Sequence, residues 1–425
     1  MQLRTTLSLI LLLSLAITTN AQNDTNSIDD KQEKNSKKIK SPENYQETEV
    51  NFLMNYYDQD GDHSPVTGGQ GTEELSNVAP SFVVHIPMDS LSSLDLNFGI
   101  DIYSSASTDN IDYFDTHKSS ASSSDARAHL NAAYSRQLKN SPNAYSVQAG
   151  FSQEYDVSSY NFGGSYSLNS QDQNRSLSLD ASYMSDSWTL LYPTELRGTS
   201  EANLSDDVRT TLKFGLSYSQ VINKRLQVLF STEVVSQSGL LSTPFHRVFF
   251  DDAFAYADNK SELATRSHIE RLDDSRIKIP VSMRWSYYLS DFMRLKTFYR
   301  FYSDSWGITA HTASIELPMM LSPSFIAAPF FRYHTQTAAD DFYEFGTASS
   351  SAEFYTSDYD LSDFDSYKVG IGFQYSPIMG ISNFKSPFRK NKMAQLKSIG
   401  LRTAYYDRSD GLNAWLVSLN LGFTF

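Results

Sequence analysis

The chain has 425 residues, a formal net charge of −14 and no cysteine. The lack of cysteine excludes disulfide scaffolds, thiolate metal centres and cysteine nucleophiles, and the negative charge argues against nucleic acid as a partner. Tyrosine (26) and phenylalanine (27) are abundant in a chain that is polar on average, as expected where apolar residues are spaced singly along strands.

The first 21 residues have the three parts of a secretory signal peptide. Arg4 supplies a positive start, residues 7–17 supply an apolar stretch, and residues 19–21 form a small-residue cleavage site. No later segment reaches the roughly 18 unbroken apolar residues of a transmembrane helix. Residues 22–46 are polar and lysine-rich, which predicts a disordered periplasmic tail before a domain that spans residues 47–425.

An acidic, glycine-rich stretch, "YYDQDGDHSPVTGGQG", follows at residues 56–71. An EF-hand is excluded, because positions six and twelve, counted from the first aspartate, are histidine and glycine instead of glycine and glutamate. Oxygen-rich Asp-Gly loops also form ordinary turns. The stretch therefore predicts either an acidic turn or a calcium site with the ligands Asp58, Asp60, Asp62 and Ser64.

Strict alternation of apolar and polar residues recurs along the chain. In "RIKIPVSMRWSY" (276–287) one row is apolar and the other basic or small, and residues 415–425 repeat the scheme. A soluble β-sandwich also alternates. Long strands, apolar rows that end in aromatic residues, and alternating short and long connections favour a transmembrane outer-membrane β-barrel.

The alternation predicts sixteen antiparallel strands, with fourteen and eighteen as alternatives. An even number places both termini on the periplasmic side, together with the short connections near 89–92, 139–143, 170–174, 223–225, 290–292 and 322–324. The predicted strands are 48–58, 77–87, 92–104, 125–137, 144–154, 158–169, 175–185, 208–221, 225–237, 276–289, 293–304, 307–320, 324–336, 367–378, 397–407 and 413–425.

If the apolar rows face lipid, the lumen is basic and only Glu233 and Glu316 stand out as inward acids. Charged rings in a pore select ions of opposite sign, so this lumen would favour anions. Alternatively, the cations pair with acidic loops that fold into the barrel and plug it. The predicted basic lumen residues are Arg127, Lys213, Arg276, Lys278, Arg284, Arg294, Lys296, Arg300, Arg332, Lys368 and Arg402.

Three other segments suggest partners. The outer loop 337–366 is acidic, so divalent cations would bridge it to lipopolysaccharide, unless it is simply a solvated surface. The basic segment 385–397, on the inner side, would dock a periplasmic protein, again unless it is merely solvated. The chain ends on Phe425, which resembles the signature that the barrel-assembly machinery reads in outer-membrane proteins.

No catalytic constellation is visible. Eight histidines occur, but none belongs to an HExxH motif, and no serine has a nucleophile elbow around it. The sequence therefore predicts that the protein is not an enzyme. It identifies no cofactor other than the calcium considered above.

The stretches "YYDQDGDHSPVTGGQGTEELSNVAPSFVV", "DIYSSASTDNID", "FYRFYSDSWGITAHTASIELP", "FRYHTQTA" and "EFYTSDYDLS" resemble a family of exported proteins catalogued as domain of unknown function 3570. The resemblance covers nearly the whole mature chain. It implies the outer membrane of a Bacteroidota-like Gram-negative bacterium and carries no catalytic residues. Members are encoded near a flavin transferase and a thioredoxin-like protein, which implies a periplasmic redox context.

Three functions follow as hypotheses. The first is a porin-like channel or transport barrel whose basic lumen favours anionic solutes. The second is a loop-plugged structural or partner-binding barrel that works with periplasmic proteins of a redox or flavinylated kind. The third is an outer-membrane enzyme, which the lack of any site geometry disfavours.

Overall fold

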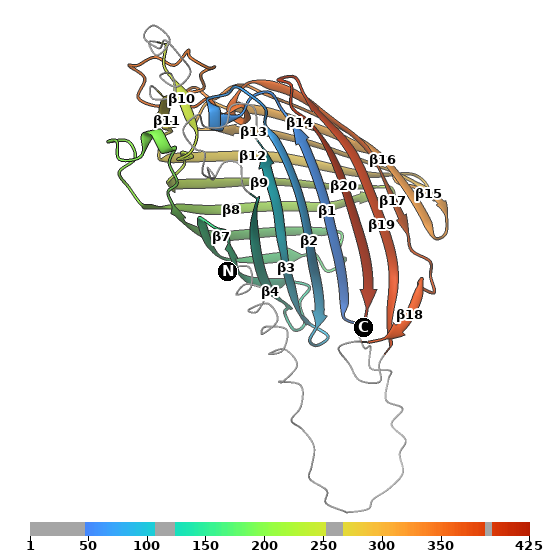
Figure 1. Cartoon of the computed structure of the whole chain (residues 1–425). Coiled ribbons are helices and arrows are strands. Elements are labelled where there is room, and N and C mark those ends of the chain that lie inside the picture. The colour runs from blue at the N-terminus through green and yellow to red at the C-terminus, as the bar shows by residue number, and fades with distance from the viewer. Residues whose placement is uncertain (1–46, 107–123, 252–266, 387–392) are drawn as a thin grey trace, which may run out of the picture.

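The computed structural model describes residues 47–106, 124–251, 267–386 and 393–425. The predicted signal peptide and tail lie outside these residues. The described part is a closed antiparallel β-barrel with sixteen strand positions in its wall (Figure 1). In wall order these are β1 (Glu49–Asp60), β2 (Glu74–Pro87), β3 (Ser92–Ala106), β4 (Ser124–Gln137), β5 (Ala144–Gln153), β6 (Val157–Asn169), β7 (Arg175–Thr189), β8 (Asp206–Asn223), β9 (Leu226–Gly239), β12 (Ser275–Ser290), β13 (Met293–Asp304), β14 (Thr309–Glu316) with β15 (Met319–Ser322), β16 (Phe325–Gln336), β17 (Phe364–Tyr375), β19 (Met393–Arg408) and β20 (Asn413–Thr424).

Closure joins the first strand to the last. β1 pairs with β2 on one side and with β20 on the other, and Thr48 and Phe425 exchange two backbone hydrogen bonds. Both ends of the wall therefore lie at the end that carries the short turns, as the even strand number requires. The prediction of a sixteen-stranded barrel is confirmed.

The structure differs from the predicted strands in two places. The strand expected at 307–320 is broken into β14 and β15 around Pro318, which has no backbone N–H to donate, although both pieces pair with β16. The short strand β18 (Ser382–Lys385), which was not predicted, pairs with β19 beyond the end of β17. β18 therefore lies beyond β17 at the short-turn end of the wall (Figure 1).

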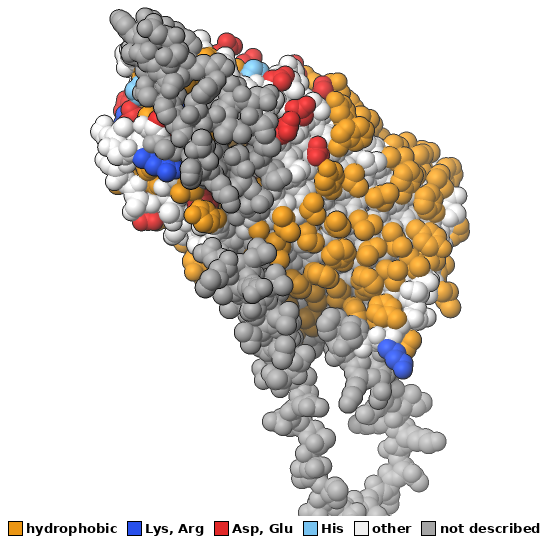
Figure 2. All heavy atoms as spheres, in the orientation of Figure 1, with side chains coloured by type: hydrophobic (Ala, Val, Ile, Leu, Met, Phe, Trp, Pro, Cys, Tyr) orange, Lys and Arg blue, Asp and Glu red, His pale blue; other side chains and the backbone are white. Residues whose placement is uncertain are grey.

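Alternation separates the two faces of the wall. Large apolar side chains such as Met54, Phe162, Phe214, Ile277 and Val369 are each at least 40% exposed on the outer face. Figure 2 shows hydrophobic side chains covering the visible face of the wall, with acidic side chains gathered toward the end that carries the long loops. The described residues contain no helix long and apolar enough to cross a membrane.

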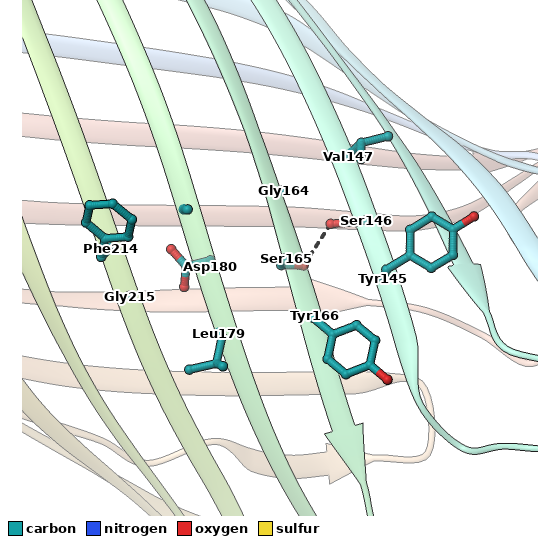
Figure 3. Close-up of a pocket in the computed structure, with 11 residues that line it drawn as sticks. Tyr145, Ser146, Val147, Gly164, Ser165, Tyr166, Leu179, Asp180, Phe214 and Gly215 are labelled. Carbon is teal, nitrogen blue, oxygen red and sulfur yellow. Dashed lines mark hydrogen bonds between the residues drawn. The ribbon is translucent and has the colours of Figure 1, made fainter.

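A hollow of about 570 Å³ lies on the outer face across the strands from β5 to β8 (Figure 3). Val147, Gly164, Ala181 and Phe214 lie directly opposite one another on these four strands. Because Gly164 and Ala181 are small, the space between the side chains of Val147 and Phe214 is not filled. Because the hollow opens away from the lumen, it is a feature of the outer apolar surface and does not form part of a passage.

The buried apolar clusters lie in and around the long loops. Val248, Phe250, Ala348 and Tyr355 form one cluster, and a second, Leu272, Trp306, Ile308 and Ala339, lies where these loops meet the barrel rim. We call the loops 61–73, 190–205, 240–274 and 337–363 the loop cap, of which residues 252–266 are not described. The cap contains the short elements η1 (Pro65–Thr67), η3 (Thr194–Leu196), β10 (Arg247–Phe249), β11 (Ser267–Ile269) and η4 (Tyr359–Leu361).

Candidate functional site

One contact between strands that are not neighbours identifies which face of the wall points into the barrel. Arg402 on β19 lies 3.0 Å from Glu316 on β14, although β16 and β17 separate these strands. Side chains three strands apart meet in this way only on the concave side of a curved sheet. Directly opposite residues share a face, so the register extends this assignment around the whole barrel.

The register places all eleven predicted basic residues on this inner face. Four of them form ion pairs there: Lys213 with Glu233, Arg276 with Asp304, and both Lys296 and Arg402 with Glu316. Arg127 donates a hydrogen bond to Ser152, and the guanidinium of Arg294 lies 5.8 Å from the ring centroid of Tyr288. The positions are Arg127, Lys213, Arg276, Lys278, Arg284, Arg294, Lys296, Arg300, Arg332, Lys368 and Arg402.

Four of these cations, on β12, β13, β16 and β17, form no ion pair with an acid, and we call Arg284, Arg300, Arg332 and Lys368 the basic patch. Arg332 lies directly opposite Lys368. Within the part of the chain that the structure describes, none of the four has an ion pair within 4.0 Å. The Nε atom of Arg300 is buried and has no hydrogen-bond partner. The patch is therefore able to accept an anion from the lumen.

The expectation that inward acids are limited to Glu233 and Glu316 was wrong. Seven further acids share the inner face, and most of them lie on the half of the wall opposite the basic patch. The pattern was present in "LDLNFGIDIY", where two of these acids alternate with apolar residues. The additional inward acids are Glu49, Asp95, Asp101, Asp180, Asp186, Asp207 and Asp304.

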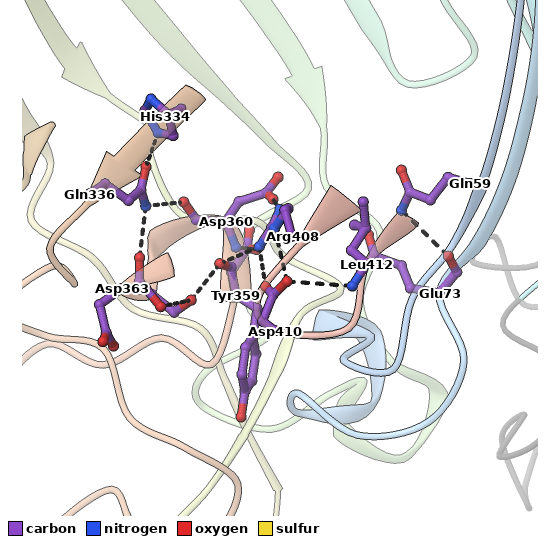
Figure 4. A network of polar contacts seen from close by, with 12 residues as sticks. Gln59, Glu73, His334, Gln336, Tyr359, Asp360, Asp363, Arg408, Asp410 and Leu412 are labelled. Carbon is purple, nitrogen blue, oxygen red and sulfur yellow. Dashed lines mark hydrogen bonds and ion pairs between the residues drawn. The ribbon is translucent and has the colours of Figure 1, made fainter. Parts of the chain in front are cut away.

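The loop between β16 and β17 folds into the outer mouth of the barrel (Figure 4). Arg408, on the inner face of β19, forms ion pairs with Asp360 and Asp410 and donates a hydrogen bond to the Tyr359 carbonyl. Gln336 donates to the carbonyls of Asp360 and Ser362. η4 is thus anchored against the inner wall, close to the end of the lumen that contains the basic patch.

The other loops of the cap contact this segment and one another. His63 stacks on Tyr359 with 3.8 Å between ring centroids. Arg247 forms an ion pair with Glu195 and donates a hydrogen bond to the Val66 carbonyl. Four loops that are distant in sequence therefore form one packed body across the mouth.

Glu73 lies where the first loop meets β2. Burial, together with Asp360 and Asp358, raises the pKa of Glu73 to about 7 from an ordinary value of 4.5. Between these two values the folded protein binds this proton more tightly than the unfolded chain does. The free energy of unfolding of the cap therefore decreases as the pH rises from about 4.5 to 7.

We expect Glu73→Gln to remove this pH dependence. At pH 8 the variant cap should resist limited proteolysis longer than the wild-type cap, because the buried charge is absent, and at pH 5 the two should be cleaved at equal rates. Equal protection at both pH values would show that the ionisation of Glu73 does not affect the cap.

The structure does not bring the predicted calcium ligands together. Asp58 lies on the outer face of β1 and accepts a hydrogen bond from Tyr56, whereas Asp62 lies next to Gly411. Ser64 is buried at the start of η1. Among the described residues, Asp58, Asp60 and Asp62 do not form a group of converging ligand atoms, so calcium at this loop stays a prediction without geometric support.

Packing explains the glycines of the same stretch. Gly69 has a φ of +87°, and a Cβ there would lie 2.8 Å from the Tyr359 ring. Gly68, with a φ of +78°, is equally close to the Phe249 ring. Only glycine combines this backbone conformation with so close an approach, so these residues fit the loop to the rest of the cap.

Of the two charged segments, the acidic loop 337–366 is described in full and the basic segment 385–397 only in part. In the acidic loop, Asp360 is ion-paired to Arg408 although its own side chain is 73% exposed, and the bridge to lipopolysaccharide stays a prediction. In the basic segment, Lys385 ends β18 and Lys397 lies 3.9 Å from Glu47. Arg389, Lys390 and Lys392 lie outside the described residues.

Together these features define a sixteen-stranded barrel with charged inner walls and a loop cap over its outer mouth. A family model described as "Protein of unknown function (DUF3570)" matches residues 13–413. The chain belongs to this family, as its sequence motifs predicted.

Solved structures with some likeness are themselves outer-membrane barrels. A bacterial polysaccharide outer membrane secretin is 10% identical with a TM-score of 0.45, over 89% of this chain and 98% of the other. Pseudomonas aeruginosa OccK1 (OpdK) is 9% identical with a TM-score of 0.38, over 89% and 98%. The siderophore receptor PirA from Pseudomonas aeruginosa is 9% identical with a TM-score of 0.39, over 88% and 80%. No curated protein matches the sequence.

Proposed function

We propose that this protein is an outer-membrane transport barrel that passes anionic solutes through a mouth constricted by its own loops. The observation that carries the proposal is the basic patch, whose cations face the lumen without a carboxylate partner among the described residues. Clustered unpaired cations on a pore wall attract anions and repel cations. The outer apolar rows support the membrane location, because lipid-facing residues alternate with lumen-facing ones in such barrels.

Ion selectivity tests this function directly. The full mature chain, reconstituted into planar bilayers with a KCl gradient, should give discrete conductance steps and a reversal potential of the sign expected for chloride preference. A reversal potential that shows potassium preference would overturn the proposal.

The loop cap favours a second candidate, a plugged barrel that works with periplasmic proteins. In that case the wild-type protein stays silent in the bilayer, and a soluble periplasmic partner co-purifies with it until residues 22–46 or 385–397 are deleted. Conductance by the intact wild-type chain would exclude the plugged barrel.

A location in the outer membrane implies further partners. Lipopolysaccharide and outer-membrane lipids would cover the apolar rows, and the barrel-assembly machinery would recognise the last strand, β20. The passage of solutes needs no catalytic step, so the proposal assigns no residue to catalysis.

A further inference from the structure

A buried cluster of three potential metal ligands lies inside the loop cap. His246 precedes β10 and Glu270 follows β11, so both belong to the loop between β9 and β12, whereas Asp358 precedes η4 in the loop between β16 and β17. Their ligand atoms all lie within 4.8 Å of one another. The Nδ1 atom of His246 is 3.5 Å from Glu270 Oε1 and 3.8 Å from Asp358 Oδ2.

The Nδ1 atom of the His246 imidazole lies at the centre of this cluster. His246 is only 9% exposed, and its Nδ1 atom is buried without a hydrogen-bond partner. Buried polar atoms in native proteins nearly always have a partner, so an exception indicates a missing ligand or ion. Here the atom points at two carboxylates that are too distant for good hydrogen bonds.

Neighbouring groups hold both carboxylates in place. Glu270 Oε2 accepts the backbone N–H of Thr243 at 2.6 Å, and Glu270 Oε1 accepts the hydroxyl of the fully buried Thr356. Asp358 Oδ1 accepts the backbone N–H of Asp360 at 2.9 Å, which leaves Oδ2 directed at His246. Metal ligands in proteins are oriented by outer hydrogen bonds of this kind.

Electrostatics agrees with the geometry. Two carboxylates this close together inside a packed body need a compensating positive charge, which a divalent cation supplies.

We propose that His246, Glu270 and Asp358 bind a divalent transition-metal cation, of the class of Zn²⁺, that fastens the two largest cap loops to each other. A cation bound at 2.0–2.2 Å in tetrahedral geometry keeps neighbouring ligand atoms about 3.4 Å apart, close to the two distances given above. One imidazole and two carboxylates suit Zn²⁺ better than Ca²⁺, which takes six to eight oxygen ligands. Water would complete the shell.

Zn²⁺ binding to the full mature barrel in detergent tests this inference without any measurement of transport. Isothermal titration after treatment with a chelator should show one Zn²⁺ per chain, and Co²⁺ in its place should give the visible absorption of tetrahedral coordination. Bound Zn²⁺ should also slow the proteolysis of the cap, and the chelator should reverse this protection.

The variants Glu270→Gln and Asp358→Asn keep the shape of each side chain and should weaken binding by roughly 10-fold or more, as should His246→Ala. His268→Ala is the matched control, because His268 lies on the adjacent β11 but pairs with Glu201, and it should bind Zn²⁺ like the wild type. Heat-modified migration in gels reports whether each barrel is folded. A wild-type barrel that does not bind Zn²⁺, or folded variants that bind it unchanged, would overturn the inference.

Discussion

Replacing residues 338–362 with a short glycine-serine linker is expected to raise the single-channel conductance several-fold. The removed segment carries η4, which Arg408 and Gln336 hold against the inner wall at the mouth. A short linker suffices, because Gln336 and Phe364 lie directly opposite each other on β16 and β17. Recordings in planar bilayers measure the change, with heat-modified migration as the check that the barrel has folded.

A pair of point variants separates the constriction from the general effects of shortening a loop. Arg408→Met removes the anchor of η4 and should give frequent transitions to a larger conductance. Glu353→Gln changes an exposed charge in the same loop and should leave the wild-type conductance unchanged. If the shortened, folded barrel conducts like the wild type, this loop does not limit the passage.

The triple variant Arg300→Gln, Arg332→Gln, Lys368→Gln is expected to abolish the chloride preference. These cations supply three of the four unpaired positive charges of the basic patch, whereas several other inner cations are neutralised by acids. The permeability ratio of chloride to potassium, obtained from reversal potentials, should fall several-fold toward or below one. The barrel should also unfold at a higher temperature, because three neighbouring like charges no longer repel one another.

The double variant Lys213→Gln, Glu233→Gln is the matched control. It removes an inner ion pair of β8 and β9, with 3.0 Å between the charged atoms, that lies outside the basic patch, and leaves the net charge unchanged. Its selectivity should equal that of the wild type. A triple variant that keeps the full chloride preference would show that ions are selected elsewhere, for example at the cap.

The strands of the barrel wall were predictable because the alternation of apolar and polar residues is a local pattern. A period of two, with Ile277, Ile279 and Val281 on one side and Arg276 and Lys278 on the other, depends only on neighbours in the chain. The predicted strand 276–289 therefore agrees with β12 (Ser275–Ser290) within one residue at each end. Where a proline or a long hairpin interrupts the rule, at β15 and β18, the prediction was less accurate.

Contacts around the barrel and within the cap were not predictable in the same way. The pair of Arg402 and Glu316 exists only because the sheet curves and closes. His63 and Tyr359 stack although they lie far apart in the sequence. His246, Glu270 and Asp358 have no motif spacing, so only the folded loops reveal that their ligand atoms converge.

The loop cap also sets the order of events during folding. Its contacts join segments such as Val66 and Arg247, which are 181 residues apart, and loops from both halves of the wall. Contacts between such distant segments form late, because the chain entropy of closing long loops opposes them. The closure of the wall, with Thr48 against Phe425, also joins distant segments, whereas each hairpin of the wall pairs neighbours in the chain. We therefore expect the hairpins to form before either long-range contact, so that the strands pass through a stage in which the mouth of the barrel is still uncovered.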